Sequence, residues 1–371
     1  MIKHQDLFYD REQEQKELGV ILNSRPNLVY FVYGPISSGK TTLLVRVLES
    51  LPSHILPFYI NFRGRDLSST GEFLNCLFKV DKKTPLDGAR EYFRELTKDG
   101  IDALSRVSGI PIPKRIFDPI FKEKDKGDDA FEYLEEFFGE LVEGGRTPVF
   151  VLDELQMIKE AANAAGRPLL DKLFNFLVRM TKETHYCHCL AATSDSLFIE
   201  EVHGNARLEG RARHFLVDDL DRDRAIKVYD SFGFKAKDLV WSYIGGKFGD
   251  MARLNAEIDL GRSESEALEQ MLMEQAGRLE GLFDLYPYIP PKVVVQGNEI
   301  TLQPERVVEA LSMAADEGEV ATGKLDEAVA RYLIERNILF FEPLKRTVRA
   351  QSQLILRGIE KALPNLRFRR S

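Results

Sequence analysis

Short apolar runs alternate with amphipathic segments over residues 1–220 of the chain. The runs are strand-sized and rich in β-branched and aromatic side chains, and they fall at residues 28–33, 56–62, 149–152 and 189–192. Strands that are apolar on both faces are typical of a sheet with helices on both sides. We therefore predict an α/β fold with a parallel sheet, flanked by helices that include a long, mostly helical stretch over residues 70–145.

The pattern of apolar positions becomes helical beyond residue 220 and stays so to about residue 285. Three prolines within residues 286–291 oppose both helix and strand, which indicates a linker. A hairpin-like run follows, then two helices, a pair of strands and a last helix. This order is typical of a winged helix, with helices at 304–316 and 324–336 and strands at 338–341 and 347–350.

These changes of pattern predict three units along the chain. The first, over residues 1–218, is the α/β core, and the second, over residues 219–285, is a helical lid. The third, over residues 286–371, is a winged-helix-like domain with a basic tail.

Residues 34–41 read GPISSGKT, the spacing G-x-x-x-x-G-K-[ST], directly after the first apolar run and before a helical pattern. A loop of this kind turns backbone N–H groups toward phosphates, its lysine reaches the outer phosphates, and its hydroxyl binds Mg²⁺. The following helix N-terminus favours the same anion. We therefore expect ATP or ADP to be bound here by Gly34, Pro35, Ser37, Ser38, Gly39, Lys40, Thr41 and Thr42.

A second motif, PVFVLDELQMI at residues 148–158, ends an apolar strand in two acids. We expect Asp153 to meet Mg²⁺ beside Thr41, and Glu154 to polarise the attacking water. Lys40 completes the catalytic set by neutralising the outer phosphates. Together these residues predict a Mg²⁺-dependent ATPase that cleaves the β–γ phosphoanhydride, rather than a small-molecule kinase, and no guanine-binding N-K-x-D signature occurs.

These two motifs resemble those of the archaeal ATPase family of P-loop NTPases, which lies between the AAA+ and STAND classes. FYDREQEQKEL at residues 8–18 is similar to the N-terminal box of that family. The resemblance covers roughly residues 5–255. It implies that Tyr9 and Arg11 lie near the adenine, although each would otherwise be a surface residue.

The resemblance extends to LAATSDSLFIEEV at residues 190–202, a sensor strand, and to the arginine-bearing segment after it. It implies that Ser194 is the catalytic sensor, with Thr193 as the alternative. It also implies that Arg211 faces the γ-phosphate of its own subunit or of a neighbour in a homo-oligomer. A solvated basic helix end is the competing interpretation of Arg211.

The lid departs from the family pattern. The family usually has Gly-Gly-x-Pro, whereas residues 243–254 read YIGGKFGDMARL and lack the proline. The coupling of the lid to the nucleotide, and a sensing role for Arg253, are therefore not implied by the resemblance.

Composition adds limits rather than chemistry. The 371 residues are 44% hydrophobic and 30% charged, as in ordinary globular proteins. No apolar stretch reaches the 18 residues of a membrane span, and the N-terminus is too polar for a signal peptide. Three cysteines provide no disulfide framework, so we expect a cytoplasmic protein without a membrane partner. We interpret HYCHC at residues 185–189 as core cysteines on a strand rather than as a metal site.

Charge is distributed unevenly along the chain. The net charge is −8, yet residues 341–371 carry eight Lys and Arg against two Glu, which leaves −14 for residues 1–340. Duplex DNA is therefore a candidate partner of the C-terminal domain, through phosphate contacts rather than base contacts. The candidate side chains are Lys345, Arg346, Arg349, Arg367, Arg369 and Arg370. The competing interpretation is that these groups pair with acidic surface of the core.

Two classes of function follow from the sequence. In the first, an ATPase powers work on nucleic acid or protein. In the second, the chain is a slow nucleotide-dependent switch that presents different surfaces to a protein partner, as STAND proteins do.

Overall fold

The computed structural model describes residues 11–65, 67, 69–81, 109–114, 117, 127–159, 168–295 and 297–367. Its largest sheet has five parallel strands in the order β2-β5-β6-β1-β7. The strands are β1 (Val29–Tyr33), β2 (Ile55–Asn61), β5 (Thr147–Asp153), β6 (His188–Thr193) and β7 (Ala212–Leu216). The predicted parallel sheet and its four predicted strands are confirmed. The fifth strand, β7, lies at an edge and was not predicted.

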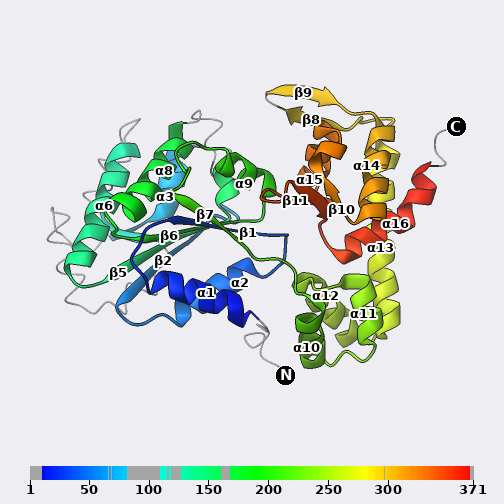
Figure 1. Cartoon of the computed structure of the whole chain (residues 1–371), viewed down its shortest axis with the longest axis horizontal. Helices are drawn as coiled ribbons and strands as arrows, with labels where there is room; N and C mark the ends of the chain where they lie inside the picture. The colour runs from blue at the N-terminus through cyan, green and yellow to red at the C-terminus, as the bar shows by residue number, and fades with distance from the viewer. Residues whose placement is uncertain are drawn as a thin grey trace.

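Helices cover both faces of this sheet (Figure 1). On one face lie α1 (Glu12–Leu22) and α2 (Lys40–Glu49), whose buried leucines pack on Val32, Val151 and Leu190. On the other face lie α3 (Thr70–Leu77), α6 (Gly127–Glu143), α8 (Pro168–Val178) and α9 (Ser196–His203). Alternate residues of each inner strand therefore point into different cores, which explains why their sequences are apolar throughout.

The described part of the stretch between β2 and β5 contains strands as well as the helices α3 and α6. Two short strands, β3 (Phe78–Asp81) and β4 (Ile110–Pro113), pair in parallel beside the main sheet. Their apolar side chains join the core that α6 covers.

The lid consists of α10 (Arg222–Phe232), α11 (Lys237–Ile244), α12 (Phe248–Asp259) and the first half of α13 (Glu264–Leu285). The Asp221 carboxylate caps α10 by accepting a hydrogen bond from Arg224 N, and Gly233 ends this helix with a φ of 80°. The second half of α13 belongs to a different core, which it shares with the C-terminal unit. The lid and the C-terminal unit are therefore connected by one continuous helix.

The C-terminal unit contains the helices and strands expected from the sequence. A hairpin of β8 (Lys292–Val295) and β9 (Asn298–Thr301) comes first, then α14 (Pro304–Glu317), β10 (Glu319–Ala321) and α15 (Glu327–Glu335). The chain continues through β11 (Leu339–Glu342) and β12 (Thr347–Ala350) to α16 (Gln353–Arg367), which packs along α13. Strands β10, β12 and β11 form an antiparallel sheet in that order.

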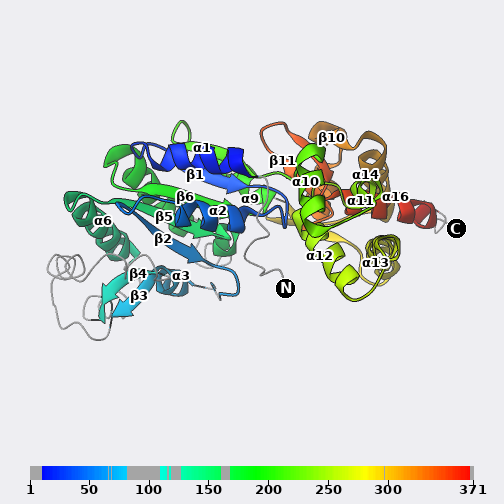
Figure 2. The ribbon, with the colours of Figure 1, turned by 90° about the horizontal axis from the view of Figure 1, so that it is seen from below.

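The C-terminal unit contacts the α/β core directly. Phe341 N donates a hydrogen bond to Ser196 Oγ at 3.3 Å, and Tyr33 Oη donates one to Glu342 Oε1 at 2.5 Å. Figure 2 shows the resulting elongated molecule, with the core at one end and the lid and C-terminal unit at the other. No helix within the described ranges is both long and apolar enough to cross a membrane.

Candidate nucleotide site

The GPISSGKT loop joins the end of β1 to the start of α2, as predicted. Gly34 has no room for a side chain, because a Cβ there would lie 2.1 Å from Val217 O. Gly39 is the N-cap of α2 with a φ of 93°, a left-handed conformation that favours glycine. Both motif glycines are therefore required by the path of the backbone, and the loop ends at the amino terminus of a helix.

The side chain of Lys40 is almost completely buried in this loop. Its Nζ donates hydrogen bonds to Gly34 O at 3.0 Å and to Pro35 O at 2.8 Å. Burial, followed by repulsion from Lys247, lowers the pKa of Lys40 to about 8. The ammonium group is therefore held beside the first residues of the loop, Gly34 and Pro35.

Thr41 and Asp153 lie in contact, although they are separated by more than a hundred residues. Thr41 Oγ1 donates a hydrogen bond to Asp153 Oδ2 at 2.8 Å. Tyr59 Oη of β2 donates to the same oxygen at 2.5 Å, and Glu154 N donates to Oδ1 at 2.9 Å. One hydroxyl and one oriented carboxylate form an oxygen donor set of the kind that Mg²⁺ uses together with substrate phosphates.

Glu154 is buried directly after this carboxylate and has a φ of 60°. A left-handed conformation is unusual for a glutamate and is typical of functional sites. Its carboxylate pairs with Arg63 and accepts a hydrogen bond from Gln156 Nε2 at 2.5 Å. The sequence motif predicted the glutamate but neither of these two partners.

The two candidate sensor residues have different surroundings. Thr193 is buried, and its Oγ1 donates to Gln156 Oε1 at 2.7 Å. Ser194 lines a cavity of about 370 Å³ together with Glu154. The geometry therefore favours Ser194 for contact with a ligand and Thr193 for positioning Gln156. Arg331 and other residues of α15 line the same cavity, so the C-terminal unit forms one of its walls.

Arg11 is buried rather than exposed, so its interpretation as a surface residue is wrong. Its Nη2 donates to Ser38 O at 2.9 Å and to Asp218 O at 2.5 Å. Arg11 therefore connects the phosphate loop to the segment that leads into the lid. Tyr9, its predicted companion at the adenine, lies outside the described residues.

The structure corrects the prediction for Arg211. This residue immediately precedes β7, and Val29 N at the start of β1 donates a hydrogen bond to its carbonyl. The phosphate loop begins at the other end of β1, about 15 Å away along a strand of this length. Because β7 runs parallel to β1, Arg211 cannot reach the γ-phosphate of its own subunit. Action across subunits stays a prediction.

The lid contributes a residue that the sequence analysis missed. Lys247 is buried, and its Nζ donates to Ile36 O of the phosphate loop at 3.0 Å. Arg253, by contrast, pairs with Glu274 of α13. A lone lysine after two glycines is a weak signal by itself, because its contact depends on how closely the lid approaches the loop.

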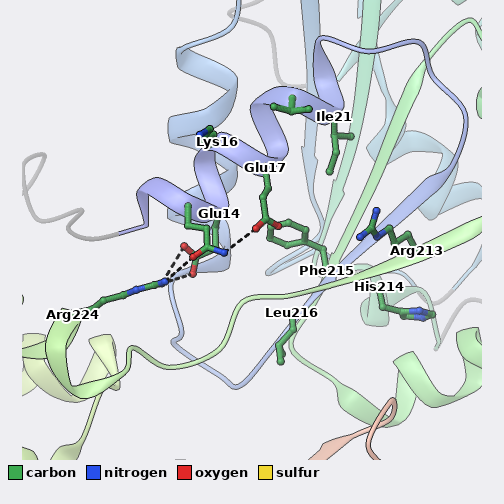
Figure 3. Close-up of a pocket in the computed structure, with 11 residues that line it drawn as sticks. Glu14, Lys16, Glu17, Ile21, Arg213, His214, Phe215, Leu216 and Arg224 are labelled. Atoms are coloured by element: carbon green, nitrogen blue, oxygen red, sulfur yellow. Dashed lines mark hydrogen bonds and ion pairs between the residues drawn. The ribbon is translucent and has the colours of Figure 1, made fainter.

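A larger groove of about 800 Å³ lies along the open edge of β7, between this strand and α1 (Figure 3). At one end, Glu14 pairs with Arg224 of α10 at 3.2 Å, and Arg11 Nη1 donates to Glu14 at 2.7 Å. The groove does not include the phosphate loop. Its ion pairs tie the first helix of the core to the lid.

The basic candidates of the C-terminal unit are in unlike surroundings. Arg349 pairs with Asp218 of the core and covers the Phe340 ring, so this side chain fits the competing interpretation of pairing with the core. Lys345 lies 3.5 Å from Glu319 at the tight turn between β11 and β12, and Arg346 in the same turn has a φ of 55°. The side chains of Arg367, Arg369 and Arg370 lie outside the described residues.

Comparisons with known proteins agree with this geometry. Residues 8–254 match the family model of an ATPase domain found predominantly in Archaea. The chain belongs to this archaeal ATPase family. Residues 265–363 match the C-terminal domain of MJ1010-like ATP-binding proteins. The resemblance inferred from the two sequence motifs is thereby confirmed.

Relatives of similar length occur among the archaeal ATPases. The uncharacterized ATP-binding protein MJ1609 of Methanocaldococcus jannaschii is 37% identical over 96% of this chain and 100% of its own length. The uncharacterized ATP-binding protein PYRAB12000 of Pyrococcus abyssi is 36% identical over 97% and 99%. The Walker-type ATPase Paby2304 of Pyrococcus abyssi has a similar fold, with a TM-score of 0.61 at 15% identity, over 96% of this chain and 97% of its own. ATP binding is thus a property that this chain shares with its family.

Proposed function

We propose that this archaeal ATPase is a Mg²⁺-dependent enzyme that hydrolyses the β–γ phosphoanhydride of ATP. The contact between Thr41 Oγ1 and Asp153 Oδ2 carries the proposal, because it brings the two oxygen ligands together beside Glu154. Thr41 and Asp153 would hold Mg²⁺ there, and the ion would neutralise charge on the outer phosphates. Lys40, whose ammonium group lies beside Gly34 and Pro35, binds the same phosphates.

Glu154 activates the attacking water in this proposal. Its carboxylate lies one residue beyond Asp153 and lines the same cavity as Ser194. Gln156 donates to one of its oxygens, and Arg63 pairs with the other. These partners fix the orientation of the base, while Ser194 contributes a hydroxyl to the side where the water approaches.

Two variants test this division of labour. Glu154→Gln keeps the size of the side chain and is expected to bind ATP while losing turnover by a factor of about 10² or more. Lys40→Ala removes phosphate binding and is expected to lose ATP affinity as well as turnover. Equal losses of ATP affinity in the two variants contradict the assigned roles, and turnover by the wild-type chain without divalent metal contradicts the role of Mg²⁺.

A homo-oligomer is the setting in which Arg211 acts on phosphate. Since Arg211 lies at the far end of the sheet, its proposed role requires the nucleotide of a neighbouring subunit. Mixing Arg211→Ala chains with Glu154→Gln chains tests this role. Activity that returns in mixed oligomers supports it, and stable mixed oligomers that remain inactive contradict it.

A second candidate function, the nucleotide-dependent switch, is favoured by the position of α15. In a winged helix, which the order of α14, β10, α15, β11 and β12 resembles, this helix enters the DNA groove. Here most of α15 is buried, and Arg331 faces the cavity that contains Glu154. Tightly retained ADP with negligible steady turnover supports the switch, whereas a steady rate that duplex DNA raises supports an ATPase working on DNA.

A further inference from the structure

Two lysines, rather than one, are buried on the phosphate loop. Lys40 belongs to the loop itself, whereas Lys247 comes from the lid and immediately precedes α12. Only 4% of the Lys247 side chain is exposed. Its Nζ lies 3.0 Å from Ile36 O and 3.0 Å from Asp219 Oδ1. A buried ammonium group that contacts a loop carbonyl and interacts with two buried acids, Asp219 and Asp250, requires an explanation.

The position of Lys247 along the loop indicates which part of a nucleotide it meets. The lysine of this motif reaches the outer phosphates, and Lys40 Nζ lies on the carbonyls of Gly34 and Pro35. Lys247 Nζ lies on the next carbonyl, that of Ile36. The two ammonium groups therefore donate hydrogen bonds to consecutive backbone carbonyls in the first part of the loop. We expect the outer phosphates to bind near this part of the loop.

Glycines in the lid make this close approach feasible. A Cβ on Gly246 would lie 1.7 Å from Leu220 O, and a Cβ on Gly249 would lie 2.6 Å from Ser37 Cβ. The backbone on both sides of Lys247 is thus in direct contact with the phosphate loop or with the segment leading into the lid. A side chain at Gly249 would push the lid away from the phosphate loop, and one at Gly246 would displace the segment that leads into the lid.

The charges around Lys247 leave two interpretations. Asp219 is its ion-pair partner, and burial raises the pKa of this carboxyl. In the structural interpretation, Lys247 only neutralises the buried acids Asp219 and Asp250. In the functional interpretation, Lys247 and Lys40 form a pair of cations on neighbouring carbonyls of one loop, and a bound polyphosphate offsets their mutual repulsion.

We propose that Lys247 is a phosphate ligand carried by the lid, and that it binds the outermost phosphate of ATP beside Lys40. Lid closure then depends on the nucleotide, because the lid contributes one of the charges that hold it. The proposal rests on the proposed function only as far as ATP binding is concerned. Since its test measures binding, a chain that binds ATP without hydrolysing it leaves the test intact.

The experiment separates the two interpretations by removing first one charge and then both. Lys247→Met removes the ammonium group at similar volume, and Lys247→Met with Asp219→Asn removes the complete ion pair. Arg253→Met is the matched control, because it removes a cation of α12 that pairs with Glu274. Calorimetric titrations with a non-hydrolysable Mg²⁺–ATP analogue and with Mg²⁺–ADP, together with melting temperatures, are measured for each chain.

We expect Lys247→Met to weaken binding of the ATP analogue by about tenfold or more and binding of ADP by less than about threefold. Its melting temperature falls, because Asp219 is left buried without its partner. The double variant recovers part of the melting temperature, since Asp250 still lacks the charge of Lys247, but it does not recover the affinity for the ATP analogue. Recovery of both overturns the proposal and leaves Lys247 as the counter-ion of Asp219. Equal losses for ATP and ADP overturn the assignment to the outermost phosphate.

Discussion

Tyr59 and Asp153 are joined by a hydrogen bond of 2.5 Å between Tyr59 Oη and Asp153 Oδ2. The two residues lie on the neighbouring strands β2 and β5, near the carboxyl ends of the strands, where the phosphate loop also begins. Burial raises the pKa of Tyr59, so its hydroxyl remains a donor at any physiological pH. The tyrosine therefore fixes the orientation of the carboxylate that we assign to Mg²⁺.

Tyr59→Phe is expected to raise the Mg²⁺ concentration needed for half-maximal ATP turnover by about tenfold, because outer-shell hydrogen bonds hold metal ligands in place. The rate at saturating Mg²⁺ changes little, since no group that contacts substrate is removed. Initial rates over a Mg²⁺ titration provide the measurement. Tyr243→Phe is the control, because that tyrosine donates to Glu269 on the surface of the lid. An unchanged Mg²⁺ dependence speaks against the positioning role.

Asp250 of α12 is a buried acid whose ionisation costs stability. Burial raises its pKa from 3.8 to about 6, repulsion from Asp219 adds to this, and Lys247 and Arg253 oppose it. Its Oδ2 has no hydrogen-bond partner among the described residues. A carboxyl whose pKa is raised by folding binds protons more tightly in the folded chain, so the folded state loses stability as pH rises from about 4 to 6.

Asp250→Asn is therefore expected to stabilise the folded chain by about 2 kcal/mol at pH 7 and by less than about 1 kcal/mol near pH 4. Free energies of unfolding from denaturant titrations at the two pH values measure the difference. Asp259→Asn, at the exposed end of the same helix, is expected to have no such pH dependence. A gain that is the same at both pH values contradicts the role of ionisation.

Local motifs predicted the centre of the site because it is built from two segments that are each continuous in sequence, residues 34–42 and 148–158. An apolar run before Gly34 and a helical pattern after Lys40 were sufficient to place the phosphate loop between strand and helix. The acids at the end of β5 were predicted from the same logic. For these residues, the position directly after an apolar run in the sequence is also the position at the end of a strand in the structure.

The remaining features depend on contacts between distant segments. β7 was not predicted, because an edge strand with a charged residue such as Arg213 lacks the continuous apolar run of an inner strand. Arg211 comes just before this strand, but the sequence does not reveal that the strand is parallel to β1. Arg211 therefore lies at the amino ends of the strands, whereas the phosphate loop follows the carboxyl end of β1. The contact of Lys247 with the phosphate loop was not predicted, because it depends on how the lid packs against the loop.

The ion pair between Arg349 and Asp218 provides a test of how the C-terminal unit is held against the core. Arg349→Gln removes the charge and is expected to increase hydrogen exchange across β11 and β12, because a polar contact between the C-terminal unit and the core is lost. Arg346→Gln is the matched control on the same pair of strands, since Arg346 lies in the connecting turn. Equal exchange in the two variants contradicts a docking role for Arg349.

The last prediction concerns the basic end of the chain and duplex DNA. The inward position of Arg349 leaves the turn residues Lys345 and Arg346 as candidates, with Arg367, Arg369 and Arg370 of the tail. We expect weak, sequence-tolerant binding in a low-salt gel shift. About five phosphate contacts predict a logarithmic salt slope of roughly −4 to −5. Because α15 is largely buried, base-specific binding is not expected.

The variant for this test must remove charge without damaging the core. Leu366 is buried, so the chain is truncated directly after this residue, and Lys345 and Arg346 are changed to Glu. Binding of DNA is expected to fall below detection while ATP affinity stays unchanged. The control changes Lys16 and Arg213, which line the groove between α1 and β7, to Glu. It makes the same change of charge as at the turn and is expected to weaken DNA binding far less. Loss of stability without loss of DNA retardation assigns the basic end to contacts within the protein. If the intact chain does not retard DNA in a low-salt gel shift, DNA is not one of its partners.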